Sequence, residues 1–165
     1  MQLTRLLRHL LLPDWWVLRA FSPTLLRRIE EAVAASESTH LGELRVVVEA
    51  NLPLPGLWRD QTPRQRAIDL FAQLGVWDTA CNSGVLIYLQ LIDRRVEIVA
   101  DRGIDARVGG EFWRGVCRKV ESAFQAGEFE RGTLLALNTI TEALREHFPA
   151  PGENPDELPN APLLL

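Results

Sequence analysis

Oxygen-bearing side chains flank a pair of predicted strands in this sequence. Four of them stand out: Asp78, Asn82, Asp101 and Asp105. Carboxylate and amide oxygens are the ligands that Ca²⁺ and Mg²⁺ prefer in proteins. The sequence therefore predicts an open divalent-cation site with Asp78, Asp101 and Asp105 as metal ligands. The alternative is that Asp101 pairs with Arg102 in a loop, and that Asp105 or Asn82 caps a turn.

The two strands between these residues follow one another closely. Gly84–Ile92 is an almost unbroken apolar run, which is typical of a strand covered on both faces. Arg95–Asp101 alternates like a second strand. Because only Asp93-Arg94 separates them, we expect a tight antiparallel hairpin. Pairing across this turn places Gly84 opposite Gly103.

The same pairing places Asn82 across from Asp105, and neighbouring strands lie about 4.8 Å apart. The expected ligand-binding residues at this end of the sheet are Asn82, Ser83, Gly84, Arg102 and Gly103. The glycines would let backbone approach a ligand closely, and Arg102 could hold a phosphate through two hydrogen bonds. The stretch shows neither a nucleophile paired with a base nor a two-metal cluster. We therefore assign no catalytic residue.

Other side chains with catalytic or metal-binding chemistry are scattered. His9, His40 and His147 lie far apart and near predicted helix ends, which favours surface or capping roles. Cys81 and Cys117 lack a partner at CxxC spacing and are interpreted as free thiols. The motifs GxGxxG, GxSxG, HExxH and the P-loop do not occur.

The elements that must position the site are those of one α/β domain. Ser22-Pro23 and Thr62-Pro63 combine a capping side chain with a proline, and each predicts a helix start. The β-branched run at residues 43–50 predicts the first strand. Amphipathic helices at residues 110–126 and 129–148 close the domain.

Length and charge limit the function. A chain of 165 residues fits one domain, which we place at residues 22–148, between a basic amphipathic extension (1–21) and a Pro-rich tail (149–165). The net charge of −4 gives no reason to expect nucleic acid. Residues 1–28 nevertheless hold five arginines and one acid. The extension either packs on the domain or lies on a membrane surface or partner.

Three stretches resemble the TPM domain family: Asn82–Tyr88, Asp93–Ile104 and Phe124–Gly132. Residues 42–48 are similar to the family's first strand. The resemblance covers about residues 22–148 and implies an α/β sandwich whose central sheet of about four strands is flanked by helices on both faces. Cys81 departs from the family, which usually has an acidic residue there, so one carboxylate that could bind metal is missing.

The resemblance implies several roles, because members have been described as acid phosphatases, divalent-cation binders and accessory proteins. We expect a binding or accessory module that takes Ca²⁺, Mg²⁺ or a protein partner at the Gly84/Gly103 end. The alternative is a weak metal-dependent acid phosphatase at the same edge. An export signal and a membrane anchor, which are common in the family, are not recognisable here. We therefore expect a cytoplasmic variant, for which peripheral membrane contact through residues 1–21 is one of the two alternatives.

Overall fold

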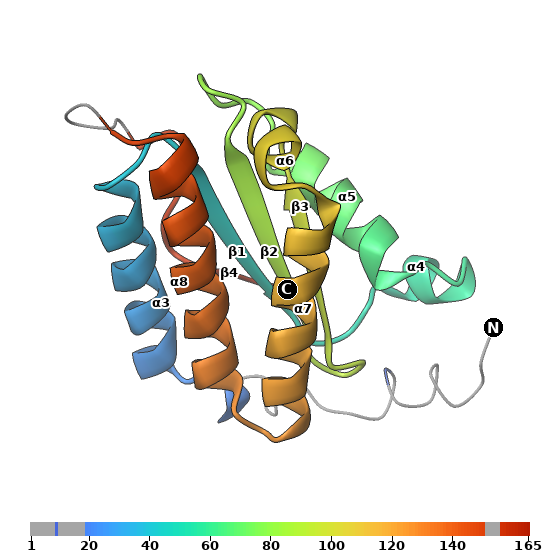
Figure 1. The fold of residues 1–165 in the computed structure, drawn as a ribbon. Helices are drawn as coiled ribbons and strands as arrows, with labels where there is room; N and C mark the ends of the chain where they lie inside the picture. Colours follow the sequence, from blue (N-terminus) through green and yellow to red (C-terminus); the bar gives the residue numbers. More distant parts are fainter. Residues whose placement is uncertain (1–8, 10–18, 151–155) are drawn as a thin grey trace.

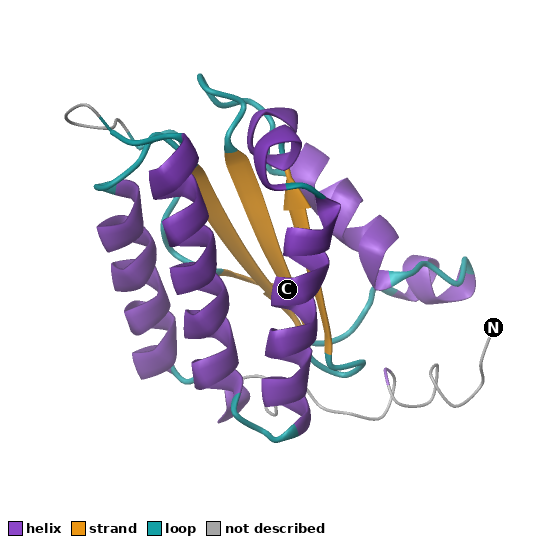
Figure 2. Cartoon of the chain, in the orientation of Figure 1, coloured by secondary structure: helices purple, strands orange, loops and turns teal. Residues whose placement is uncertain are grey.

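Figures 1 and 2 show an α/β sandwich in which helices cover both faces of a mixed sheet, as predicted. This computed structural model describes residues 9, 19–150 and 156–165. The described helices are α3 (Pro23–Glu37), α4 (Leu54–Trp58), α5 (Pro63–Gln73), α6 (Arg102–Val108), α7 (Gly110–Gln125) and α8 (Phe129–His147). The described strands are β1 (Glu43–Glu49), β2 (Gly84–Gln90), β3 (Arg95–Ala100) and β4 (Leu163–Leu164).

The sheet has the strand order β3-β2-β1-β4. β1 runs parallel to β2 and to β4, whereas β2 and β3 form the predicted antiparallel hairpin. Glu43 aligns with Gly84, so β1 and β2 begin at the same end of the sheet. β3 ends there too, because it runs in the opposite direction. Loops from several parts of the chain therefore meet at this end.

The helix starts follow the local sequence. The Ser22 side chain accepts a hydrogen bond from the Leu25 N–H at 3.3 Å, and Pro23 follows it as the first residue of α3. Thr62 and Gln65 form a reciprocal capping box ahead of α5. These bonds satisfy backbone donors that have no partner inside a helix. Both starts were predicted from the cap-and-proline pattern.

Two apolar layers hold the sheet. Helices α3, α7 and α8 cover one face, where Leu44, Val46 and Val48 of β1 are buried. Helix α5 packs against the other face, where Val47 of β1 is buried with Tyr88. Both faces of β1 are therefore removed from solvent, and all seven of its residues are buried.

Three short elements were not predicted. α4 lies in a Pro-rich stretch, α6 begins among the expected ligand-binding residues, and β4 lies in the expected tail. Each is too short to show a repeat of apolar residues. α6 forms because Asp101 acts as its N-cap, and β4 forms because β1 offers an open edge.

The hairpin register differs from the predicted one by two residues. Pairing ends at Gln90, so four residues rather than two connect the strands. The Gln90 side chain explains the difference, because its Oε1 accepts the Asp93 N–H at 2.7 Å and closes the loop. The carbonyl of Gly84 accepts the Asp101 N–H at 2.8 Å. Gly84 is therefore opposite Asp101 and not opposite Gly103.

Most of the predicted amphipathic extension (1–21) lies outside the described residues, which include only His9 and residues 19–21 of it. His9 is buried rather than at the surface, and its Nδ1 accepts the Leu52 N–H at 3.1 Å. Its Nε2 lies 3.4 Å from Asp93 Oδ1. Across the described residues, no helix combines the length and the apolar character that a membrane span requires.

Candidate functional site

The predicted metal ligands lie near the end of the sheet where β1 and β2 begin, but they do not converge. Asp105 Oδ1 accepts a hydrogen bond from Trp113 Nε1 at 2.8 Å, which ties α6 to α7. Asp101 caps α6, and its Oδ1 accepts the Arg102 N–H at 2.7 Å. Asp78 is exposed in the loop before β2. Among the residues described, no group of three metal-binding side chains includes any of these aspartates.

The two predicted glycines contact the chain's own backbone. A Cβ at Gly84 would lie 1.9 Å from the Val76 carbonyl oxygen, and one at Gly103 would lie 2.4 Å from that of Asn82. The Gly103 N–H donates to the same Asn82 carbonyl at 2.9 Å. Glycine is needed at both positions because backbone segments meet there. The space beside each glycine is thus filled rather than open to a ligand.

The remaining predicted residues hold this end of the sheet together or face solvent. Ser83 is buried, and its Oγ donates to the Leu41 carbonyl at 2.9 Å. Its N–H donates to Thr79 Oγ1 at 3.1 Å. The first bond joins the loop before β1 to the loop before β2, and the second lies within the loop before β2. Arg102 is exposed in the first turn of α6.

A different set of carboxylates converges at the same end of the sheet. One oxygen from each of Glu37, Glu43 and Asp156 lies within 4.8 Å of the other two. Glu37 ends α3 and Glu43 begins β1, so the short connection between these elements brings the two together. Asp156 arrives from the C-terminal segment, which we define as residues 156–165. The sequence analysis selected none of the three.

The two glutamates each use one oxygen to bind backbone. Glu37 Oε1 accepts the Leu44 N–H at 2.8 Å, and Glu43 Oε2 accepts the Leu158 N–H at 3.2 Å. Glu37 is only 4% exposed and Glu43 is fully buried. The second oxygen of Glu37, Oε2, is buried and has no hydrogen-bond donor among the described residues, unless Glu37 and Asp156 share a proton. A buried oxygen without a partner costs free energy, so this atom has capacity for a ligand.

Burial and like charge both favour the protonated form of these side chains. Burial raises the pKa of Glu37 to about 8, and the neighbouring carboxylates of Glu43 and Asp156 add to the effect. Burial also raises the pKa of Glu43 to about 7, with contributions from Glu157 and Asp156. The cluster therefore holds protons near neutral pH. A divalent cation could replace those protons.

The C-terminal segment lies along β1. The Glu157 carboxylate accepts the Ala80 N–H at 3.2 Å, which attaches the start of the segment to the loop before β2. The buried guanidinium of Arg45 donates to the Pro159 carbonyl at 2.7 Å. β4 then pairs with the second half of β1. The expected tail is thus part of the wall of the candidate site.

A buried serine–histidine pair lies in the connection between α3 and β1. Ser36 Oγ is 2.7 Å from His40 Nε2, and His40 Nδ1 accepts the Gly42 N–H at 3.1 Å. The proton of the neutral ring is therefore on Nε2, which donates to Ser36. Burial lowers the pKa of His40 to about 4, so the ring is neutral at physiological pH. This nitrogen cannot accept the serine proton, and the pair is structural.

The Cys117 thiol does not supply a nucleophile either. Cys81 and Cys117 are free, as predicted. Burial raises the pKa of the Cys117 thiol to about 11, and the nearby Glu97 adds to the effect. Cys117 is therefore a protonated thiol at neutral pH, whereas reactive cysteines have a lowered pKa.

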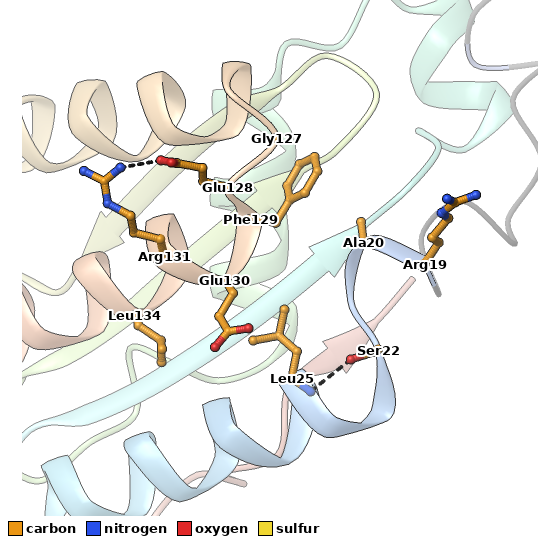
Figure 3. A pocket seen from close by; sticks show the side chains of 10 residues that line it. All are labelled: Arg19, Ala20, Ser22, Leu25, Gly127, Glu128, Phe129, Glu130, Arg131 and Leu134. Atoms are coloured by element: carbon orange, nitrogen blue, oxygen red, sulfur yellow. Dashed lines mark hydrogen bonds and ion pairs between the residues drawn. The ribbon is translucent and has the colours of Figure 1, made fainter.

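A cavity of about 650 Å³ lies at the opposite end of the fold, between the first turns of α3 and α8 (Figure 3). Phe129 lines it together with charged side chains. Glu128 pairs with Arg131, and Glu130 pairs with Arg28. Because these acids already have basic partners, we place the candidate site at the carboxylate cluster.

Comparisons with known proteins agree with this fold. Chain residues 19–143 match the TPM domain. The NMR structure of the BA42 protein from the psychrophilic bacterium Bizionia argentinensis is 28% identical, with a TM-score of 0.76 over 87% of this chain and 94% of that one. The N-terminal domain of a P. gingivalis protein is 21% identical and shares the fold, with a TM-score of 0.62 over 77% of this chain and 80% of that one. No curated protein matches. The chain belongs to the TPM domain family.

Proposed function

We propose that this chain is a binding module that holds a divalent cation, Ca²⁺ or Mg²⁺, with Glu37, Glu43 and Asp156. The observation that carries the proposal is the approach of three carboxylate oxygens to within 4.8 Å of one another. The buried Glu37 Oε2, which lacks a donor among the described residues when the carboxylates are ionised, supports it.

The chemistry of the cluster suits a hard cation. Ca²⁺ and Mg²⁺ bind carboxylate oxygens and complete their coordination with carbonyl groups or water. A double positive charge would offset the repulsion between these carboxylates. Since the pKa of Glu37 is raised to about 8 and that of Glu43 to about 7, binding at neutral pH would release protons.

The proposed site is at the end of the sheet that the sequence analysis selected, but it uses other residues. Asp101 caps α6 through Oδ1, its Oδ2 is buried without a hydrogen-bond partner among the described residues, and Asp105 binds Trp113. Neither aspartate belongs to the group of three converging carboxylates. Cytoplasmic placement, a protein partner and membrane contact through residues 1–21 stay predictions from the sequence.

Calorimetric titration of chelator-treated protein with Ca²⁺ or Mg²⁺ tests the proposal. We expect one binding event per chain, with proton release seen as a dependence of the heat on the buffer. Glu37→Gln should weaken binding at least about tenfold, because it removes one charged ligand. Glu30→Gln is the matched control, since Glu30 is exposed on the same helix.

Absence of binding for both ions, or equal binding by wild type and Glu37→Gln, would overturn the proposal. Asp105→Asn separates this site from the one predicted by sequence. It should leave cation binding unchanged, whereas a loss comparable to that of Glu37→Gln would move the site to α6.

A weak metal-dependent acid phosphatase stays the alternative hypothesis. Ser36 and Cys117 offer no activated nucleophile, so a metal-bound water would have to attack the phosphate. Hydrolysis of a phosphate ester that needs the cation and is lost in Glu37→Gln would make the chain an enzyme.

A further inference from the structure

The proposed cation site joins two parts of the fold. Glu37 and Glu43 belong to α3 and β1, in the body of the domain. Asp156 is the first residue of the C-terminal segment, whose last residues form β4 on the outer edge of β1. A cation that binds all three carboxylates therefore contacts the body and the segment at once.

The other contacts of the segment are a short strand pairing and hydrogen bonds, which include those from Ala80 N–H to Glu157 and from Leu158 N–H to Glu43. β4 pairs with β1 at only two positions. Arg45 donates to the carbonyls of Pro159 and Ala161, and the segment's apolar residues Leu158 and Leu163 are only partly buried. So short a strand adds little stability by itself. The attachment of the segment is thus sensitive to any further bond.

The acids at the start of the segment lie where it meets the body of the domain. The segment begins with Asp156 and Glu157, and one carboxylate oxygen of Asp156 lies within 4.8 Å of oxygens of Glu37 and Glu43. Among the described residues, none of the ion pairs involves Glu37, Asp156 or Glu157. A divalent cation bound by all three carboxylates would attract each of them and so hold the segment to the body.

We propose that the cation held by Glu37, Glu43 and Asp156 fastens the C-terminal segment to the sheet and so controls whether β4 covers the edge of β1. This inference rests on the proposed cation site. The attachment of the segment and the binding of the cation are coupled equilibria, so each changes the other by the same factor. If the ligand from the attached segment raises cation affinity about tenfold, the bound cation raises the equilibrium constant for attachment about tenfold. If the C-terminal segment detached from the sheet, the edge of the seven-residue strand β1 would be open to pairing with another strand.

Amide hydrogen exchange at constant pH, with Ca²⁺ or with a chelator, measures this coupling. Three amide hydrogens report on the segment, because their hydrogen bonds join it to the body: those of Leu158, Leu165 and Ala50. The Leu91 N–H, which donates to the Glu49 carbonyl between β1 and β2, is the internal control. We expect Ca²⁺ to slow exchange about tenfold at the three reporters and to leave Leu91 unchanged.

Asp156→Asn should abolish the effect of Ca²⁺ on the three reporters. Asp156 is exposed, so the substitution should not prevent folding. Glu157→Gln is the matched control, because Glu157 is the adjacent acid but is outside the group of three. The effect of Ca²⁺ should persist in that variant.

The outcomes separate this inference from the cation proposal. Calorimetric binding without slower exchange at the reporters overturns the fastening and leaves the cation site standing. Equal slowing at Leu91 means general stabilisation and also overturns it, as does a Ca²⁺ effect that survives in Asp156→Asn. Absence of calorimetric binding removes the cation site, and the fastening with it.

Discussion

The two ends of β1 carry buried glutamates in opposite electrostatic settings. Glu43 and Glu49 are six positions apart and so point to the same face of the strand. Glu49, which is 1% exposed, binds Arg66 through Nε at 3.1 Å and Nη2 at 2.6 Å. The Tyr88 hydroxyl donates to its second oxygen at 2.5 Å. Glu43 instead faces the carboxylates of Glu37 and Asp156.

The difference separates a structural carboxylate from a candidate ligand. At Glu49 the charge is balanced and each oxygen has a donor, so the site needs nothing further. Burial raises the pKa of Tyr88, with Glu49 adding to the effect, and keeps its hydroxyl protonated as a donor. At Glu43 the carboxylates of Glu37 and Asp156 are close neighbours, and protons or a cation can compensate their charge. A buried acid beside other acids is therefore a better candidate for a ligand than one that is paired with a base.

The largest expected effect comes from breaking the balanced end. Arg66→Met should lower the free energy of unfolding by about 3 kcal/mol, because it leaves the buried Glu49 without its basic partner. Urea denaturation measures the loss. Arg59→Met, at an exposed arginine, should change stability by less than about 0.5 kcal/mol. If Arg66→Met lowered the free energy of unfolding as little as Arg59→Met, the ion pair with Arg66 would not be what stabilises the buried Glu49.

A pair of equivalent substitutions compares the two ends directly. With a chelator at pH 8, Glu49→Gln should lower the free energy of unfolding by about 2 kcal/mol, because the charge-assisted bonds to Arg66 are lost. Glu43→Gln should raise it by about 1 kcal/mol, because the pKa of Glu43 near 7 shows that folding disfavours the ionised form.

Ca²⁺ should reverse the sign at Glu43, since the variant then lacks the stabilisation that the cation gives the wild type. Parallel urea denaturations with Ca²⁺ and with chelator supply the comparison. If Glu49→Gln and Glu43→Gln changed the free energy of unfolding in the same direction with chelator, the distinction between the two ends of β1 would be wrong.

The smallest effect concerns His40, which is beside the acidic end but outside the proposed cation site. Its folded pKa of about 4 is below the ordinary value of 6.5, so the unfolded chain binds its proton first as pH falls. The contribution of His40 to stability is therefore present above pH 6.5 and is lost as pH falls towards 4. Between pH 7 and 5.5 the loss should be about 1 kcal/mol.

Comparing wild type with His40→Gln isolates this contribution, because the glutamates titrate in both proteins. The difference in unfolding free energy between them should shrink by about that amount over the same pH range. A difference that does not vary with pH would mean that His40 titrates normally in the folded protein.

Much of the fold followed from local patterns. Ser22 and Thr62 each cap a helix, and each is followed by a proline and an apolar stripe. The capping hydrogen bonds join residues only a few positions apart, so a local pattern predicts them. The apolar run of β2 and the short gap before β3 predicted their antiparallel pairing for the same reason. The register was less accessible, since it depends on one hydrogen bond between Gln90 and the Asp93 N–H.

The candidate site was beyond such patterns. In β1, Glu43, Arg45 and Glu49 alternate with apolar residues, which is typical of a strand with one face in water. All three are buried, because α5 and the C-terminal segment cover that face. The residues next to β1 in the sequence do not indicate that α5 and the C-terminal segment will bury this face.

The sequence by itself determined the α/β class, the helix starts and the β2–β3 hairpin, because these depend on residues close together along the chain. Only the tertiary structure decided where charge accumulates. The bond from the Leu158 N–H to Glu43 spans 115 positions, and the site exists because that distant segment returns to the start of β1. Burial by remote residues, which no local pattern encodes, made Glu37 and Glu43 into a candidate site and left Asp101 and Asp105 as structural residues.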